Sequence, residues 1–469
     1  MAALMRLRPW LIAVAVAATA HLVNASDWVS ALAGLLAGVA SWHPPPRPSD
    51  SAVERRPSGP AVDLGEVVQA RELPALLLPG QRFLLELAEL DRHVAVIGAT
   101  GSGKTTTLTR LVDTALLERW PVLLVDAKGG RLAETSLAVA QRRGVGSRLW
   151  LPGHPATWTY DICAGDPIAV GNRLVGAFEF GFEAQVYRNL AQSILPLVIQ
   201  GLLSAGVVCD LDTLRFSLDR AHLTGLVRRL PDSQLKSELM TLREDELHRN
   251  TLSGLVGRLR ALRFGLFGPW LLPSERTLDL AASLVEPGLT YLGLPATAAS
   301  EDVALVGRVL VQHLKQVAYE ALWSSERRPA LIVFDEFVSL REAAQLVDLL
   351  LQAREAHLAV VVSSQHVPRD YPLRHSVLSA GTLIVHQVGS PDDADILARA
   401  LGSRSGPEVA LQLVLSREER FHRRVLRSSK HLLIPPDDLA RLPVGQAAVA
   451  VRFGEQRLGL VQVDPLRIT

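Results

Sequence analysis

The stretch GATGSGKT, Gly98 to Thr105, decides the fold of this chain, because it matches the pattern GxxxxGK[ST]. It follows the apolar run His93–Ile97 and opens the helical pattern Lys104–Glu118. Glycines at three of its positions let backbone N–H groups curl around a phosphate without side-chain clashes. The N-terminus of the following helix adds partial positive charge at the same point. We therefore expect a strand–loop–helix unit that binds the phosphates of a nucleotide.

The residues of this loop have separate expected roles. Lys104 should reach the β- and γ-phosphates, and the Thr105 hydroxyl should hold Mg²⁺. The expected ligand is therefore ATP with Mg²⁺. The residues expected to contact the nucleotide are Gly98, Ala99, Thr100, Gly101, Ser102, Gly103, Lys104, Thr105 and Thr106.

A second motif, LIVFDEF at Leu331–Phe337, supplies two acidic residues. Four apolar residues followed by two acids suit a buried strand that ends at its carboxyl edge, where open parallel sheets bind ligands. Asp335 is then a second expected Mg²⁺ residue, and Glu336 is expected to polarise the attacking water. Alone, the motif equally suits a strand followed by the acidic first turn of a helix. Beside a phosphate loop, the catalytic interpretation is favoured.

Three further positions are candidates near this site. Gln365 ends the strand-like run LAVVVSSQH and is our candidate sensor of the γ-phosphate; a plain polar strand end is the alternative. Arg354 is a candidate arginine finger for a neighbouring subunit, although Arg341 is also available and an exposed helical arginine is the simpler interpretation. The segment DAKGG at Asp126–Gly130 ends another strand-like run and is expected near the nucleotide or in a simple turn.

The chain from residue 75 onward alternates short apolar runs with helical patterns, which indicates an α/β fold with a mostly parallel sheet. Residues 183–276 break this rhythm, because leucines there recur at helical spacing. We expect an α/β nucleotide-binding domain in two parts, residues 75–182 and 277–469, around an all-α insertion at residues 183–276. The expected strands are His93–Ile97, Pro121–Asp126, Leu289–Leu294, Ala330–Asp335, Leu358–Ser363 and Thr382–Val385.

The first 43 residues predict a membrane anchor built from a helical hairpin. The segment from Trp10 to Trp42 is apolar except for a polar break, giving two short spans at about residues 9–23 and 28–42. Each is shorter than the roughly 20 residues of an ordinary span. Arginines flank both ends and none lies in the turn, which places both ends in the cytoplasm at the inner membrane. A cleaved secretion signal is the alternative, but it would export an ATPase away from ATP. Residues 44–74 are expected to be a linker.

Composition narrows the possible partners. A formal net charge of +1 excludes a globally basic nucleic-acid-binding protein, so any DNA-binding surface must be local. Two basic stretches, Arg249–Arg263 and Arg417–Lys430, could contact phosphates or form solvated faces. Cys163 and Cys209 lie far apart without a CxxC pattern, which argues against a disulfide framework and a structural zinc site.

Several motifs together resemble the type IV coupling proteins of bacterial conjugation, within the FtsK–HerA group of RecA-like DNA pumps. GATGSGKTT resembles the phosphate loop of this family, and DAKGG resembles its DPKG segment with Ala127 in place of proline. FDEF and the SSQ at Ser363–Gln365 are similar to its acid pair and glutamine motif. The segments at residues 386–402 and 435–449 are also similar. The hairpin turn is shorter than the family's periplasmic segment.

The resemblance implies a membrane-bound homohexamer that hydrolyses ATP to move single- or double-stranded DNA through a central channel. It also implies a relaxase or other nucleoprotein as cargo and a type IV secretion channel as partner. Two other functions stay open: a protein-export ATPase of the same superfamily, and a membrane scaffold that binds nucleotide without hydrolysing it. The presence of Lys104, Asp335 and Glu336 together argues against the scaffold.

Overall fold

The computed structural model divides the chain into two units, Met1–Arg55 and Arg56–Thr469. It describes residues 57–70, 79–128, 131–181, 184–242, 246–294, 300–323, 328–340, 343–415 and 420–467. The expected membrane anchor at residues 1–43 lies outside these ranges. Within them, no helix combines the length and the apolar character needed to cross a membrane.

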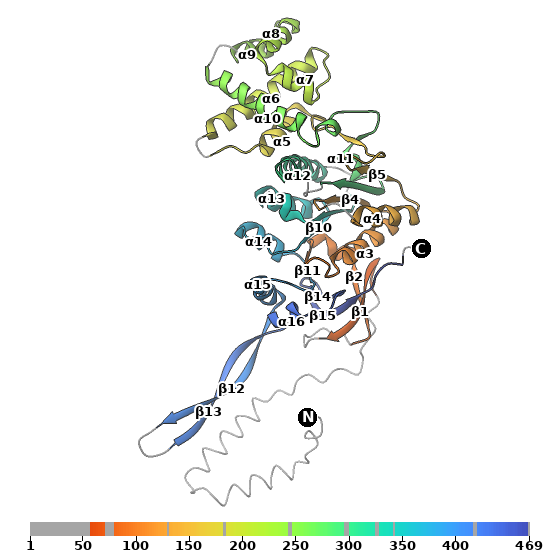
Figure 1. Cartoon of the computed structure of the whole chain (residues 1–469), viewed down its shortest axis with the longest axis vertical. Helices are drawn as coiled ribbons and strands as arrows, with labels where there is room; N and C mark the ends of the chain where they lie inside the picture. The colour runs from red at the N-terminus through yellow and green to blue at the C-terminus, as the bar shows by residue number, and fades with distance from the viewer. Residues whose placement is uncertain are drawn as a thin grey trace, which may run out of the picture. The chain divides into compact units, whose positions relative to one another are not determined.

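The described part of the chain is built on one eleven-stranded sheet (Figure 1). The seven strands from β11 to β5 run parallel, and the four at the other edge are joined to them antiparallel. In order across the sheet the strands are β2 Arg82–Glu86, β1 Ala61–Ala70, β15 Arg457–Val463, β14 Gln446–Val451, β11 Thr382–Val385, β3 Val94–Ile97, β10 Leu358–Ser364, β9 Ala330–Asp335, β4 Pro121–Asp126, β8 Gly288–Gly293 and β5 Ser147–Trp150.

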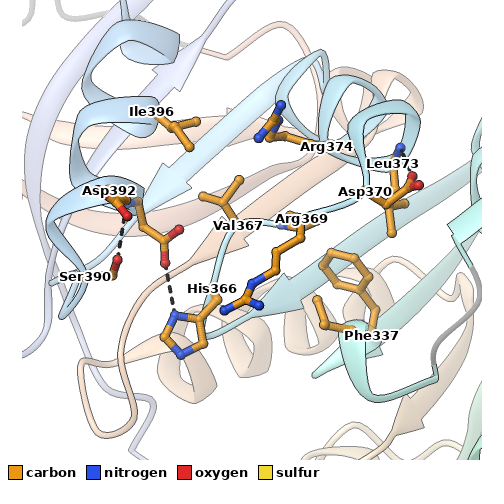
Figure 2. Close-up of a pocket in the computed structure, with 13 residues that line it drawn as sticks. Phe337, His366, Val367, Arg369, Asp370, Leu373, Arg374, Ser390, Asp392 and Ile396 are labelled. Atoms are coloured by element: carbon orange, nitrogen blue, oxygen red, sulfur yellow. Dashed lines mark hydrogen bonds and ion pairs between the residues drawn. The ribbon is translucent and has the colours of Figure 1, made fainter.

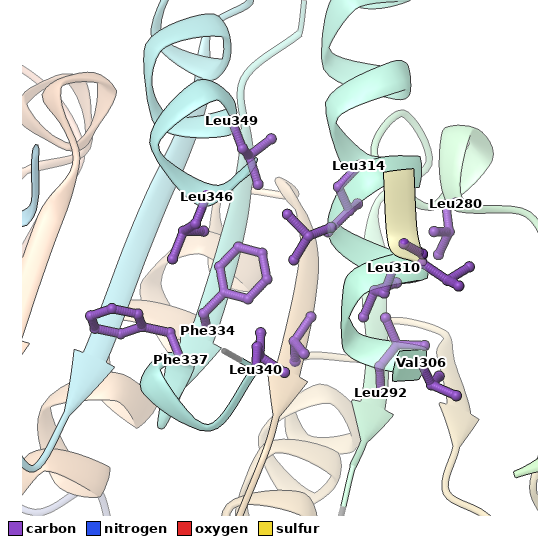
Figure 3. Packing of buried hydrophobic residues seen from close by; sticks show 14 of the residues in the cluster. Leu280, Leu292, Val306, Leu310, Leu314, Phe334, Phe337, Leu340, Leu346 and Leu349 are labelled. Carbon is purple, nitrogen blue, oxygen red and sulfur yellow. The ribbon is translucent and has the colours of Figure 1, made fainter. Parts of the chain in front are cut away.

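The central strands are buried on both faces, because helices cover each side of the sheet. Along β9, Ile332 and Phe334 join one core while Leu331 and Val333 join the other, as the two-residue period of a strand requires. Figure 3 shows the first core, where Phe334 lies against leucines of the helices above it. The helices and 3-10 segments of the α/β body are η2 Leu87–Arg92, α3 Lys104–Leu117, α4 Arg131–Arg142, α5 Pro167–Ala177, α11 Leu280–Ser283, α12 Ser300–Leu322, η5 Phe337–Leu340, α13 Ala343–Glu355, α14 Tyr371–Leu378, α15 Pro391–Leu401 and α16 Pro436–Ala440.

Strand β1 corrects the expected linker, because residues 61–70 belong to the main sheet and not to a connection ending at residue 74. Its pairing with both neighbours shifts register, which obscures the alternation of buried residues in the sequence. Gly65 explains why this strand can lie close to β15: a Cβ at this position would approach the Gln462 carbonyl oxygen to 1.9 Å. Only glycine fits there without a shift of the backbone.

The helical insertion interrupts the α/β body where the sequence predicted a change of rhythm. It contains α6 Gln185–Ser204, α7 Leu211–Ser217, α8 Arg220–Arg229, α9 Gln234–Thr241 and α10 Glu246–Phe264. The 3-10 turn η4 Gly268–Trp270 follows. Two short strands, β6 Thr159–Tyr160 and β7 Thr277–Leu278, pair in parallel on either side of the insertion and bring its two ends together.

A two-stranded ribbon, β12 Ser403–Leu415 with β13 Arg420–Leu432, forms a separate antiparallel sheet that the sequence analysis did not predict. Most of the basic stretch 417–430 falls on β13. The other basic stretch lies on α10, where two of its arginines make internal contacts. Arg263 pairs with Asp212 at 2.9 Å, and the Arg258 guanidinium stacks on Phe180.

Candidate nucleotide-binding site

The phosphate loop connects β3 to α3 at the carboxyl ends of the parallel strands. Gly101 and Gly103 have φ angles of 78° and 119°, in the left-handed region that glycine adopts without strain. At Gly98 a Cβ would lie 2.6 Å from the Cβ of His386, so a side chain there would displace the loop or the histidine. Glycine is therefore favoured at all three positions, at Gly101 and Gly103 by the backbone conformation and at Gly98 by the close approach of His386.

Backbone hydrogen bonds from three neighbouring segments hold this loop. Gly98 donates to the Ser364 carbonyl at 3.1 Å, and Ala99 donates to the Gln387 carbonyl at 2.7 Å. The Ser102 carbonyl accepts from the N–H of Gly445 at 2.9 Å. Strands β10, β11 and β14 thus shape the loop through residues at their ends.

Lys104 lies across the loop at the start of α3. Its Nζ donates to the carbonyl oxygens of Gly98 at 2.6 Å and Ala99 at 3.1 Å. Burial lowers the pKa of Lys104, while the charges of Asp335 and Glu336 oppose that shift. These neutral carbonyls are weaker partners than phosphate oxygens, so the ammonium fits the expected role of phosphate ligand.

Asp335 ends β9 and lies beside Asp126 of β4, its register partner. Burial, followed by the nearby charge of Asp126, raises the pKa of Asp335. A cation at this point would relieve the repulsion between the two carboxylates. Thr105, the other expected Mg²⁺ residue, is exposed in the first turn of α3. Within the described ranges no cluster of three or more His, Cys, Asp or Glu could hold a metal alone. Magnesium commonly completes its coordination with substrate phosphates and water, so the two expected residues fit such an ion.

Glu336, Gln365 and Thr100 form a continuous bridge across the site. The Gln365 Nε2 donates to the Glu336 carboxylate at 2.9 Å, and the Thr100 hydroxyl donates to Gln365 Oε1 at 2.7 Å. A single amide thus links the phosphate loop to the carboxylate expected to polarise water. Glu336 itself has a φ of 55°, a left-handed conformation that costs a non-glycine residue about 1–3 kcal/mol.

The bridge lies at the carboxyl ends of the parallel strands, whereas Arg354 lies at their amino-terminal ends. It is exposed near the end of α13, before β10, and its charge acts on His93 at the start of β3. The seven residues of β10 separate it from Gln365, a distance of about 20 Å at strand rise. Arg354 therefore cannot complete the site of its own chain, and its expected role requires a second subunit.

Two features of the site were not singled out by the sequence analysis. Tyr291 donates from its hydroxyl to Asp126 Oδ2 at 2.6 Å, and the Lys128 N–H donates to the other oxygen at 2.8 Å. His386 lies fully buried beneath the phosphate loop and hydrogen-bonds Thr107. Both residues had one signal in the sequence, a polar side chain at an otherwise apolar strand: Tyr291 lies within β8, and His386 directly follows β11.

A groove of about 640 Å³ adjoins the bridge on the side of α14 and α15 (Figure 2). Phe337 and His366, the residues after Glu336 and Gln365, are part of its lining. In Figure 2 the His366 ring points toward α15, where its Nδ1 lies 3.0 Å from Asp393 Oδ2. Glu336 and Gln365 are therefore each followed in the sequence by a residue that lines the groove.

The order of the central strands identifies the class of protein. β10 lies between β3, which carries the phosphate loop, and β9, which carries the acid pair. A phosphate loop, an acid pair and a polar residue on the intervening strand, all at one edge of a mostly parallel sheet, define a RecA-like P-loop nucleotide-binding protein.

Comparisons with known proteins agree with this class. Residues 62–130 match the family described as the central domain of the helicase HerA. No curated protein gives a significant sequence match. The structure resembles the unbound bacterial conjugative coupling protein TrwB with a TM-score of 0.60 and 19% identity, over 82% of this chain and 87% of that chain.

Two further solved structures have similar folds. The plasmid coupling protein TrwB in complex with ADP and Mg²⁺ gives a TM-score of 0.55 at 19% identity, over 82% of this chain and 88% of that chain. VirB4 of Thermoanaerobacter pseudethanolicus gives a TM-score of 0.50 at 14% identity, over 88% of this chain and 98% of that chain. The predicted resemblance to coupling proteins is confirmed in the fold.

Proposed function

We propose that this chain is a membrane-anchored ATPase that uses ATP hydrolysis to move DNA, as a coupling protein for a type IV secretion channel. The observation that carries the proposal is the bridge from Thr100 through Gln365 to Glu336. It connects the loop expected to bind phosphate to the residue expected to activate water. A site that only stored a nucleotide would not need this connection.

One chain supplies the phosphate-binding, Mg²⁺-binding and water-activating residues of a hydrolytic site. Lys104 exchanges its loop carbonyls for phosphate oxygens, and Thr105 and Asp335 hold Mg²⁺. When bound, Mg²⁺ supplies positive charge that favours phosphoryl transfer. Glu336 accepts the proton of the attacking water, and Gln365 exchanges its bond from Thr100 for contact with the γ-phosphate. A change at the phosphate thereby reaches Glu336 and the groove beside it.

DNA as the moved polymer is supported by the likeness in fold to proteins named conjugative coupling proteins. In this proposal a relaxase or another nucleoprotein is the cargo. The ring is a homohexamer, and residues 1–43 anchor it in the inner membrane with the ATPase body in the cytoplasm. Exposed arginines of α10, such as Arg249 and Arg260, are available for local phosphate contacts.

The decisive experiment measures ATP hydrolysis by the full chain in detergent, with and without single- and double-stranded DNA. Lys104→Ala serves as the blank. We expect DNA to raise the rate several-fold in the wild type and not in the variant. Hydrolysis that is indifferent to DNA but responds to a polypeptide cargo would favour the protein-export function. Nucleotide binding without any hydrolysis would favour the scaffold.

A further inference from the structure

We infer that His386 is a positioning residue that keeps the phosphate loop in its binding shape through Thr107; the inference rests on the proposed nucleotide site. His386 follows β11, and its N–H donates to the Ile97 carbonyl at 2.8 Å, directly before the loop begins. The side chain is fully buried. It therefore lies under the loop as part of its support and not in the space open to a ligand.

The hydrogen bonds of the ring define its protonation. Nδ1 lies 3.0 Å from the Gln446 carbonyl oxygen, which can only accept, so Nδ1 carries the hydrogen. Nε2 lies 2.9 Å from the Thr107 hydroxyl. Because the ring is neutral, Nε2 has a free lone pair and accepts the hydroxyl hydrogen. Burial lowers the pKa of His386 to about 4, and the charge of Lys104 acts in the same direction.

The ring also occupies the space that the loop glycines leave open. Its Cβ is the atom that a side chain at Gly98 would meet at 2.6 Å, and its Cε1 would lie 3.3 Å from a Cβ at Gly103. The Thr107 N–H bonds the Gly103 carbonyl in the first turn of α3. The His386 side chain thus occupies the space beside Gly98 and Gly103, and its ring hydrogen-bonds the helix turn from which Lys104 extends.

This arrangement predicts that the Thr107–His386 bond affects nucleotide affinity and not only folding. Thr107→Val removes the hydroxyl but keeps the shape, and leaves a buried ring nitrogen without a donor. Thr107→Ser retains the hydroxyl. His386→Asn retains a donor toward the Gln446 carbonyl but loses the acceptor for Thr107. We expect Thr107→Val and His386→Asn to bind nucleotide about tenfold more weakly, and Thr107→Ser to stay within about twofold of wild type.

The experiment is a titration of the full chain in detergent with a fluorescent ATP analogue and Mg²⁺, together with KM and kcat for hydrolysis. Thr382→Val is the control, because Thr382 lies buried on β11, the strand before His386, and no hydrogen-bond partner for its hydroxyl is present among the described residues. We expect KM to rise with the Kd while kcat changes much less. The thermal midpoint without nucleotide is measured for every variant.

The possible outcomes separate this inference from the proposed function. If Thr107→Val lowers the thermal midpoint but binds within twofold of wild type, the bond is only structural and the inference is wrong. If the wild type binds nucleotide but DNA does not stimulate it, the proposed function fails and the affinity ratios still decide the role of His386. A wild-type chain that binds no nucleotide overturns both.

Discussion

Glu336, the residue proposed to activate water, has an unusual backbone conformation. Its φ of 55° is unfavourable for a residue with a side chain, yet the turn places its carboxylate against Gln365. Strain of this kind persists where surrounding structure holds it, and it recurs at functional sites. The strand β9 before it and the 3-10 turn η5 after it are both packed into the core. The geometry therefore supports a role beyond that of a surface acid.

Glu336→Gln tests that role. The amide keeps the shape and an oxygen that accepts from Gln365, but it cannot take a proton from water. We expect hydrolysis to fall by about 10²–10⁴-fold, with nucleotide affinity within a few-fold of wild type. Steady-state hydrolysis and a binding titration measure the two effects. Glu355→Gln, at an exposed acid near the end of α13, is the matched control and should change neither. Unchanged hydrolysis in Glu336→Gln would remove the assigned base.

At the scale of elements, two helices anchor the strand that carries the acid pair. α12 and α13 cover one face of the sheet, and Figure 3 shows Leu314 of α12 and Leu346 of α13 directed toward the core around Phe334. Leu314 is fully buried there. Because this core lies directly behind Asp335 and Glu336, its packing also supports the position of the site.

Leu314→Ala should therefore lower the free energy of unfolding by about 2–5 kcal/mol, the usual cost of a cavity left by a buried leucine. Urea unfolding followed by circular dichroism measures the change. Leu351→Ala is the control on the neighbouring helix, because Leu351 is 64% exposed, and it should stay within about 0.5 kcal/mol of wild type. Equal effects of the two substitutions would show that this helix layer does not support the sheet as described.

At the scale of the whole molecule, one chain does not bring together all the residues assigned to hydrolysis. Lys104, Asp335, Glu336 and Gln365 meet at the carboxyl edge of the sheet, whereas Arg354 lies near its amino edge. A ring of copies could bring the arginine of one chain to the site of the next. Closed homo-oligomers use such head-to-tail contacts.

Mixing two inactive variants tests this assembly. Arg354→Ala chains keep an intact site, and Lys104→Ala chains keep the arginine. Random mixing in equal amounts should restore about a quarter of the wild-type hydrolysis. The reason is that about a quarter of the subunit contacts join the intact site of an Arg354→Ala chain to the intact arginine of a Lys104→Ala chain. A mixture of Lys104→Ala with Glu336→Gln is the control. Both changes fall in the same site, so no chain in this mixture has an intact site and hydrolysis should not recover. No recovery with Arg354→Ala would exclude this arginine as the finger.

Most of the local structure of the site could be predicted from sequence. The phosphate loop depends on glycines within eight consecutive residues, and the acid pair lies at the end of a fully buried strand. The helix α3 was also expected close to its observed bounds. These features are specified by neighbours along the chain, so their residue types are sufficient to indicate them.

The sequence by itself determined the phosphate-loop motif, the acid pair and the strands that carry them, whereas the tertiary structure decided how those strands are ordered. The Thr100–Gln365–Glu336 bridge and the position of His386 both depend on β11, β3, β10 and β9 lying side by side. Pairing with β15 and β2 brings β1 into the sheet, and Arg354, just before β10, lies at the amino-terminal end of the parallel strands. These contacts join residues that are far apart along the chain. Their geometry follows from strand register and core packing, which no local pattern specifies.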